Sequence, residues 1–257
     1  MKKRLDVLLV ERGLADSRAK AQALVLAGRV PGHSKAGSQV ATDADLAVLE
    51  GPRYVSRGGD KLVGALEDFE LDVEGLVCAD IGASTGGFTH CLLDAGAARV
   101  CAIDFCYGQL DTHLRDDPRV DVLERTNARS LAPGDIPVAP ALITCDVSFI
   151  SFRLVVAPLV ACAAAGWKAI VLLKPQFEAG PKLVGKGGVV RDPAVHRTVL
   201  VEACGWVDEQ GWSVRGVEPS RVQGAKGNQE FFVLIESGRA ESALSFVEAA
   251  LQKAAGV

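Results

Sequence analysis

The stretch Asp80-Ile81-Gly82-Ala83-Ser84-Thr85-Gly86-Gly87-Phe88-Thr89 indicates the fold of the larger part of the chain. It follows the apolar run 76–79 and leads into the apolar segment 88–93, which predicts a strand, a glycine turn and a helix. Such a unit opens a doubly wound parallel sheet and usually holds a nucleotide-like cofactor. The glycines permit a tight turn and let a ligand approach the backbone, although glycine also serves simple packing of a helix on a strand.

The spacing of these glycines is G-x-x-x-G-G, which differs from the G-x-G-x-x-G of dinucleotide-binding proteins. In that fingerprint the second glycine brings the backbone against a pyrophosphate. Here Ser84 and Thr85 occupy the middle of the turn. The spacing therefore favours a cofactor without phosphates and disfavours an NAD-dependent oxidoreductase, which stays as an alternative.

Charge is distributed unevenly along the 257 residues. The formal net charge is −4, which taken alone argues against a nucleic-acid partner. Residues 1–61, however, contain eleven Lys and Arg against seven Asp and Glu, whereas residues 62–257 contain seventeen against twenty-five. The basic excess lies in the N-terminal part, where we expect contact with nucleic acid.

The seven cysteines form no C-x-x-C pair and lie mostly in apolar runs, which is typical of reduced core residues in a cytoplasmic protein. The basic start of the chain is not followed by a signal-peptide apolar region, and the longest uncharged run, 154–167, is too short to span a bilayer. The four histidines are scattered without metal-ligand spacing. We therefore expect a cytoplasmic protein without a metal or a stable membrane association.

The N-terminal segment has the pattern of a small α+β module. Residues 4–13 predict a short amphipathic helix ended by glycine, and Asp16-Ser17 caps a second helix over 18–27. Short apolar runs at 29–30, 39–40 and 46–49 predict strands. Four basic residues share one face in this arrangement, which is either an RNA-contacting face or a solvated charged face: Arg12, Arg18, Lys20 and Arg29.

The order R-L-D-x-x-L-x-x-x-G, then S-R-x-x-A, then G-x-V resembles the small RNA-binding module of bacterial ribosomal protein "S-four", tyrosyl-tRNA synthetase and many pseudouridine synthases. The resemblance covers about residues 4–50 and implies that a basic helix pair rests on RNA backbone. One departure is the segment Val30-Pro31-Gly32-His33-Ser34, where the module usually has V-x-V-N-G. We expect domains at 1–50 and 61–257, joined by a linker at 51–60 that is rich in glycine.

From residue 62 onward short apolar runs alternate with helical patterns, which predicts a parallel sheet covered on both faces. Helices are expected at 202–210 and 241–255. The seven expected strands are 76–79, 100–103, 120–123, 141–145, 169–173, 213–217 and 231–235.

Charged residues end the first five of these strands, where ligands bind in open α/β sheets. They are Asp80, Asp104, Glu124, Asp146 and Lys174. Single acids in this position also serve as helix caps, but five charged groups at one edge indicate a site. Asp104 lies where such folds place a carboxylate on ribose hydroxyls. Asp121 and Asn127 either meet an adenine edge or shape their loop.

Lys174 ends an apolar strand and is therefore partly removed from water. Burial favours its neutral amine, which removes a proton from a hydroxyl nucleophile. The neighbouring Asp146 favours the ammonium, which stabilises a developing oxyanion. The sequence leaves both roles open.

Motifs across the larger part resemble the FtsJ-like ribose methyltransferases, and more closely the TlyA-type, haemolysin-like group that carries the RNA-binding module in front. They are 80–89, Asp104 with Tyr107-Gly108-Gln109-Leu110, Glu124-Arg125-Thr126-Asn127, Cys145-Asp146-Val147-Ser148-Phe149-Ile150, Lys174-Pro175-Gln176-Phe177-Glu178, 185–192 and 227–232. The resemblance implies a Rossmann-like enzyme with a seven-stranded, mostly parallel sheet. It further implies S-adenosylmethionine-dependent 2′-O-methylation of ribosomal RNA, with cytidine as the nucleotide and ribosomal RNA or subunits as partners.

The resemblance also assigns residues to roles. The catalytic set that it implies is Lys61, Asp146, Lys174 and Glu230, of which Lys61 and Glu230 rest on the family pattern alone. The expected cofactor-binding residues are Asp80, Gly82, Ser84, Thr85, Gly86, Gly87, Phe88, Asp104, Asn127 and Asp146. The expected RNA contacts are Arg4, Arg12, Arg18, Lys20, Arg29, Arg57, Lys182 and Lys186, the last two in a glycine-rich loop that either closes over RNA or is merely flexible.

Two other classes of protein remain as alternatives. A non-catalytic RNA-binding or ribosome-assembly factor would keep the cofactor fold without needing Asp146 and Lys174. A membrane-active haemolysin would need a spanning helix or a basic amphipathic one, and the sequence shows neither.

Overall fold

The computed structural model describes residues 2–26, 29–49, 52–185, 187–224, 226–238 and 242–256. The chain divides into two compact units, 1–53 and 54–257, and each is described by itself. Lys186, an expected RNA contact, lies outside the described residues.

In its described residues, the N-terminal unit contains two helices and a two-stranded sheet. Strands β1 (Lys2–Arg4) and β2 (Gln39–Ala41) pair antiparallel, and they enclose helices α1 (Leu5–Glu11) and α2 (Arg18–Leu26) in the sequence. Both helices bury apolar side chains in one small core, which includes Leu5, Leu8, Leu9, Ala21 and Val25.

Two of the strands expected in this unit are absent from the structure. The segments 29–30 and 46–49 are irregular and meet through a backbone hydrogen bond from Leu49 N–H to the carbonyl of Arg29 at 2.7 Å. Lys2–Arg4, in contrast, is a strand because Lys3 lies opposite Val40 in the ladder, so the first helix begins at Leu5 rather than at Arg4. Apolar alternation over two to four residues is too short a signal to fix strand pairing.

Helix α3 (Arg57–Asp68) begins inside the segment that the sequence suggests as a linker. Ser56 caps the helix by accepting a hydrogen bond from Gly58 N–H. Gly59 serves close packing here, because a Cβ at this position would lie 2.1 Å from Cγ of Tyr54. A glycine that suggests a linker therefore marks a close contact between α3 and the preceding Tyr54.

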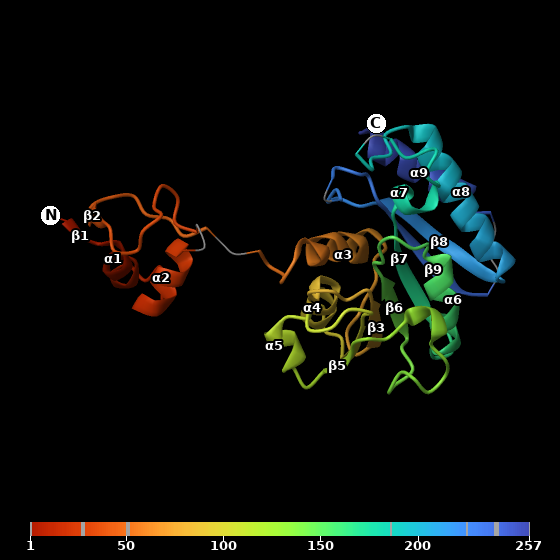
Figure 1. Cartoon of the computed structure of the whole chain (residues 1–257), viewed down its shortest axis with the longest axis horizontal. Helices are drawn as coiled ribbons and strands as arrows, with labels where there is room; N and C mark the ends of the chain where they lie inside the picture. The colour runs from red at the N-terminus through yellow and green to blue at the C-terminus, as the bar shows by residue number, and fades with distance from the viewer. Residues whose placement is uncertain are drawn as a thin grey trace. The chain divides into compact units, whose positions relative to one another are not determined.

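The larger unit is built on a seven-stranded sheet in the order β5-β4-β3-β6-β7-β9-β8 (Figure 1). All pairs are parallel except the two that involve β9, which runs antiparallel to both β7 and β8. This confirms the expected fold class. The bounds are β3 (Val77–Ile81), β4 (Arg99–Ile103), β5 (Val120–Leu123), β6 (Leu142–Cys145), β7 (Lys168–Leu173), β8 (Trp212–Pro219) and β9 (Phe231–Ser237).

Helices cover both faces of this sheet because alternate strand residues point to opposite sides (Figure 1). Cys78 and Val100 pack in the core that includes residues of α3 and α4 (Gly87–Asp94), whereas Ala79 and Cys101 pack in the other core. That second core includes residues of α6 (Arg153–Ala161), α8 (Pro193–Glu209) and α9 (Leu244–Ala255). The short helices are α5 (Thr112–Arg115), the 3-10 turn η1 (Ala128–Ser130) and α7 (Pro175–Glu178).

The strand order creates two features at the carboxyl edge of the sheet. Strand β3 lies between β4 and β6, and this change of winding direction opens a crevice at the glycine turn. Strand β9 runs in reverse, with Phe231 opposite Leu173, so the residue before β9 lies beside the residue after β7. The preceding residue is Glu230 and the following one is Lys174, which brings both to the same edge.

Candidate active site

The glycine turn after β3 packs directly against the segment after β6. Gly82 has a φ of +77°, and a Cβ at this position would lie 2.4 Å from the carbonyl oxygen of Asp146. A Cβ at Gly87 would lie 2.2 Å from Oγ of Ser56. These positions therefore require glycine for space, and the first of them also for backbone conformation.

Asp104 joins the glycine turn to the end of β4. Its carboxylate accepts hydrogen bonds from the backbone N–H groups of Ser84 at 2.8 Å and Cys106 at 2.7 Å. Ser84 has a φ of +50°, a left-handed conformation that this bond helps to hold. Each carboxylate oxygen retains a lone pair, so Asp104 remains able to accept a bond from a hydroxyl group of a ligand.

Asp80 lies beneath the glycine turn and not in the cavity above it. Its side chain is fully buried and accepts hydrogen bonds from the hydroxyls of Thr89 at 2.7 Å and Thr144 at 3.2 Å. Burial raises the pKa of the Asp80 carboxyl to about 7, and the two hydroxyl bonds offset part of that effect. Asp80 therefore ties α4 and β6 to β3 and supports the turn from below.

We expect Asp80 to lower the free energy of unfolding as the pH rises from about 4 to about 7. The unfolded chain releases this proton near pH 3.8 and the folded chain near pH 7, so between these values the folded state binds more protons. Relative to the wild type, the free energy of unfolding of Asp80→Asn should rise by about 3 kcal/mol between pH 5 and pH 8, as measured by urea unfolding.

The matched control for this measurement is Asp117→Asn. Arg119 holds the pKa of Asp117 below its usual range, so the stability difference of this variant should not change above pH 5. An Asp80→Asn difference that is the same at pH 5 and pH 8 would contradict the assignment.

A cavity of about 660 Å³ opens above the glycine turn at the carboxyl edge. One wall comes from the turn itself and from the start of α3, including Gly82, Ser84, Thr85, Gly87, Phe88, Ser56 and Arg57. The opposite wall comes from the segments after β6 and β7 and before β9. Its polar residues include Asp146, Ser148, Lys174, Gln176, Asn228 and Glu230.

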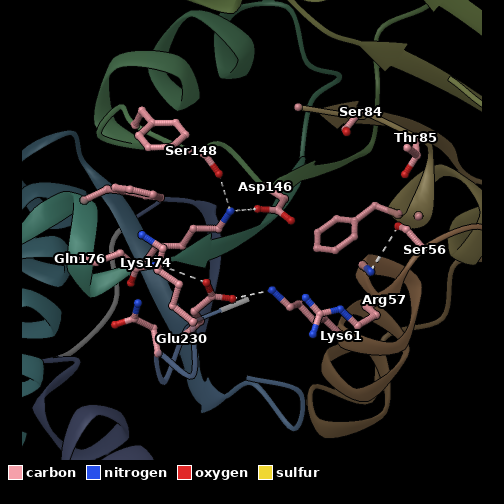
Figure 2. Close-up of a pocket in the computed structure, with 18 of the residues that line it drawn as sticks. Ser56, Arg57, Lys61, Ser84, Thr85, Asp146, Ser148, Lys174, Gln176 and Glu230 are labelled. Carbon is pink, nitrogen blue, oxygen red and sulfur yellow. Dashed lines mark hydrogen bonds and ion pairs between the residues drawn. The ribbon is translucent and has the colours of Figure 1, made fainter. Parts of the chain in front are cut away.

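Two lysine–carboxylate ion pairs lie in this cavity (Figure 2). Lys174 Nζ contacts Oδ1 of Asp146, and Lys61 Nζ donates to Oε2 of Glu230 at 2.5 Å. The lysine side chains are only 10–11 % exposed. The four residues that the family pattern implies, Lys61, Asp146, Lys174 and Glu230, are thus brought together by α3, β6, β7 and β9, and we call them the tetrad.

Further polar residues of the site stand two positions from tetrad members. Lys174 donates to Oγ of Ser148 at 3.0 Å, and the amide nitrogen of Gln176 donates to Oε1 of Glu230 at 3.3 Å. The sequence reasoning does not single out Ser148 or Gln176. For Ser148 the spacing from Asp146 is a signal, because alternate residues of an extended chain point to one side. Gln176 lies in the first turn of α7, which begins directly after Lys174, and no alternation marks it.

Asn228 stands in the same way before Glu230 and holds the glycine-rich loop. Its side chain is 4 % exposed, accepts a hydrogen bond from Val190 N–H at 2.9 Å and donates to the carbonyl of Gly188 at 2.9 Å. Both ends of the amide are therefore used to fasten the described part of this loop beside the cavity.

Several other expected residues, including Asp104 and Gly86, lie apart from the cavity lining. Glu124 binds Arg115 at 2.5 Å and Gly108 N–H at 2.8 Å, and Asp121 forms a two-point ion pair with Arg99. Asn127 is exposed and caps the 3-10 turn by accepting from Arg129 N–H. Asp121 and Asn127 thus take part in shaping a strand and a loop, and their contact with an adenine edge stays a prediction.

The expected RNA contacts fall into several environments. Arg57 lines the cavity, and Lys182 is exposed in the loop after α7. In the N-terminal unit, Arg12 donates to the backbone carbonyls of Thr42 and Ala44, Lys20 is exposed and Arg29 is half-buried. Arg4 and Arg18 both bind one buried carboxylate.

The arrangement suits proton handling at a hydroxyl group. A lysine paired with a carboxylate can accept a proton or stabilise a negative oxygen, and the tetrad contains two such pairs. Among the described residues there is no cluster of three or more His, Cys, Asp and Glu side chains that could hold a metal ion.

The larger unit combines a parallel sheet that has one reversed strand, a glycine turn without the phosphate-binding spacing, and a lysine–carboxylate tetrad. Together these features define a methyltransferase-type α/β enzyme. Residues 54–237 match the FtsJ-like methyltransferase family, and residues 3–30 match the S4 domain. The chain therefore belongs to the FtsJ-like methyltransferase family and carries an S4 domain near its N-terminus. Both resemblances expected from the sequence motifs are confirmed.

Several known proteins are similar along most of their length. The 16S/23S rRNA (cytidine-2′-O)-methyltransferase TlyA of Mycobacterium tuberculosis is 46% identical over 254 residues, covering 96% of this chain and 95% of that protein. Hemolysin A of Brachyspira hyodysenteriae is 39% identical over 235 residues, covering 89% and 97%. The solved structure of a candidate hemolysin from Streptococcus thermophilus has a TM-score of 0.78 at 37% identity, covering 99% and 96%.

The name haemolysin raises the question of membrane insertion. Within the ranges that the structure describes, no helix combines the length and apolar character that crossing a membrane requires.

Proposed function

We propose that the protein transfers a methyl group from S-adenosylmethionine to the 2′-hydroxyl of a cytidine in ribosomal RNA, in the cytoplasm. The observation that carries this proposal is the position of the Lys174–Asp146 pair in the same cavity as the glycine turn. The relative named TlyA, which is similar over nearly the whole chain, supports ribosomal RNA and cytidine as the substrate.

The cavity fits a nucleoside cofactor without phosphates. Gly82, Ser84, Thr85 and Gly87 of the turn line the cavity. Asp104 lies outside the cavity lining, but its carboxylate binds the N–H of Ser84 in the turn and retains acceptors for ribose hydroxyls. S-adenosylmethionine, when bound, supplies a methyl group that its sulfonium charge has already activated. The protein must then align the hydroxyl with that methyl group and manage one proton.

Lys174 is the group that we assign to this proton. The hydroxyl loses its proton as its oxygen takes the methyl group. Lys174 either accepts this proton as a neutral amine, or stabilises the oxygen as an ammonium while the proton passes to solvent water. Asp146 and Ser148 hold the amine at one position in both cases.

The Lys61–Glu230 pair forms the second half of the tetrad. Glu230 is 2 % exposed and is held by Lys61 and by the amide of Gln176. We assign this pair to orienting the ribose, because a buried carboxylate with a free lone pair can accept a bond from a sugar hydroxyl.

Nucleoside analysis by mass spectrometry tests the proposed function. Purified protein, S-adenosylmethionine and ribosomal RNA or subunits should yield 2′-O-methylcytidine, and omission of S-adenosylmethionine is the control. Methylation on a base would contradict the proton-handling scheme, and the absence of any methylated nucleoside would contradict the proposal itself.

A further inference from the structure

The N-terminal unit contains a fully buried carboxylate among exposed cations. Asp6, on α1, has an exposed fraction of 0 %, whereas the side chains of Arg4 and Arg18 are 45 % and 58 % exposed. Buried acids are rare without partners because water no longer solvates the charge. This acid is therefore placed where it organises the groups around it.

Asp6 binds both arginines through geometry that restricts them. Arg4 forms a two-point bond, with Nε at 3.0 Å from Oδ1 and Nη2 at 2.9 Å from Oδ2. Arg18 Nη2 donates to the same Oδ2 at 3.1 Å, and the amide nitrogen of Gln22 donates to it at 2.8 Å. Because one oxygen receives a bond from each arginine, the two guanidinium groups lie side by side.

The backbone opposite Arg4 completes this placement. A Cβ at Gly37 would lie 3.3 Å from both terminal nitrogens of Arg4, so the absence of a side chain there leaves room for the guanidinium.

The hydrogen bond from Arg4 holds the pKa of Asp6 far below its usual range. A hydrogen bond from Gln22 lowers this pKa further, whereas burial raises it. The carboxylate therefore remains ionised at neutral pH.

We propose that Asp6 is a positioning residue for RNA binding, which holds the guanidinium groups of Arg4 and Arg18 at a fixed separation for contact with RNA phosphates. The inference rests on the proposed function, which makes RNA the substrate. Each arginine keeps nitrogen donors that Asp6 does not occupy, and arginine can bind phosphate with two of them. An arginine that is already ordered loses less conformational entropy when it binds.

This proposal and a simple charge argument predict opposite results for Asp6→Asn. If net charge alone decided affinity, removal of a negative charge beside two arginines would strengthen binding to RNA. If Asp6 positions the arginines, the same substitution weakens binding although the unit becomes more positive. The sign of the change in affinity therefore separates the two explanations.

The experiment measures the affinity of the full-length protein for ribosomal RNA transcripts at several KCl concentrations. Asp6→Asn should weaken binding about fivefold to tenfold, because the side chains of Arg4 and Arg18 would then be ordered only when RNA binds. The Michaelis constant for RNA should rise with an unchanged turnover number and unchanged binding of S-adenosylmethionine. The control is Glu11→Gln, which removes an exposed acid paired with Lys3 in the same unit and should bind as tightly as the wild type or more tightly.

The measurements distinguish a failure of this inference from a failure of the proposed function. Equal or tighter binding by Asp6→Asn, in a protein whose circular dichroism and thermal unfolding show a folded N-terminal unit, overturns the inference and leaves the proposed function intact. A wild type that neither binds nor methylates RNA would instead contradict the proposed function.

A second variant serves if Asp6→Asn fails to fold. Arg4→Lys keeps the positive charge and leaves Arg18 and Gln22 on Asp6, but it removes the two-point bond that fixes Arg4. The inference requires that Arg4→Lys binds RNA at least about threefold more weakly, because its unrestrained side chain must lose conformational entropy on binding. Wild-type affinity of Arg4→Lys overturns it.

Discussion

Lys174→Ala is expected to reduce the rate of methyl transfer by about a thousandfold or more, while the affinity for S-adenosylmethionine changes little. The amine lies in the cavity against Asp146 and Ser148, and its removal leaves no group in this position to accept the proton or stabilise the oxygen. Single-turnover methylation with labelled S-adenosylmethionine measures the rate, and calorimetry measures binding of the cofactor.

The control for Lys174 lies at the other end of the same strand. Lys168 begins β7, and its ammonium forms an exposed ion pair with Glu236 at 3.2 Å. Lys168→Ala removes the same side chain without touching the cavity, so its activity should stay near that of the wild type. Near-normal turnover by Lys174→Ala would show that another group manages the proton.

Gly82→Ala is expected to have the largest effect on the fold of the site. Its φ of +77° strains any residue with a Cβ, and that Cβ would also lie 2.4 Å from the carbonyl oxygen of Asp146. Strain of about 1–2 kcal/mol and overpacking of about 1–3 kcal/mol add to a destabilisation of roughly 3 kcal/mol. Urea unfolding measures this loss, and methylation should fall with it because Asp146 must move.

Gly211→Ala separates backbone strain from steric overlap as causes of the destabilisation. Gly211 has the same φ of +77°, but a Cβ there would meet nothing within 4 Å. This variant should lose about 1–2 kcal/mol from backbone strain alone and keep its activity. If Gly82→Ala destabilises no more than Gly211→Ala and remains active, the close approach of the turn to Asp146 is not essential.

The sheet is largely predictable because its strands are short continuous apolar runs buried on both faces. The expected run 169–173, for example, corresponds to β7 with a shift of one residue. Charged residues after such runs stand out, so Asp146 and Lys174 emerge from the residues alone. The glycine turn is equally visible, since few other residues satisfy its backbone.

The rest of the site depends on contacts between distant parts of the sequence. Lys61 and Glu230 are 169 positions apart and form one ion pair in the structure, and no local pattern joins them. Asp80 is part of β3 and faces the interior, although as a charged residue after an apolar run it suggests an exposed strand end. In each case the tertiary environment, which a linear pattern does not contain, decides the role.

The reversed strand β9 also determines when the tetrad can be completed during synthesis. Translation produces the cofactor turn, Asp146 and Lys174 well before residue 230, and Glu230 reaches the edge only when Phe231 docks opposite Leu173. A nascent chain that ends after β7 would thus contain the glycine turn and Lys61 but would lack Glu230, the carboxylate that binds Lys61 in the structure. Pairing of β9 with β7 is therefore the step that completes the tetrad.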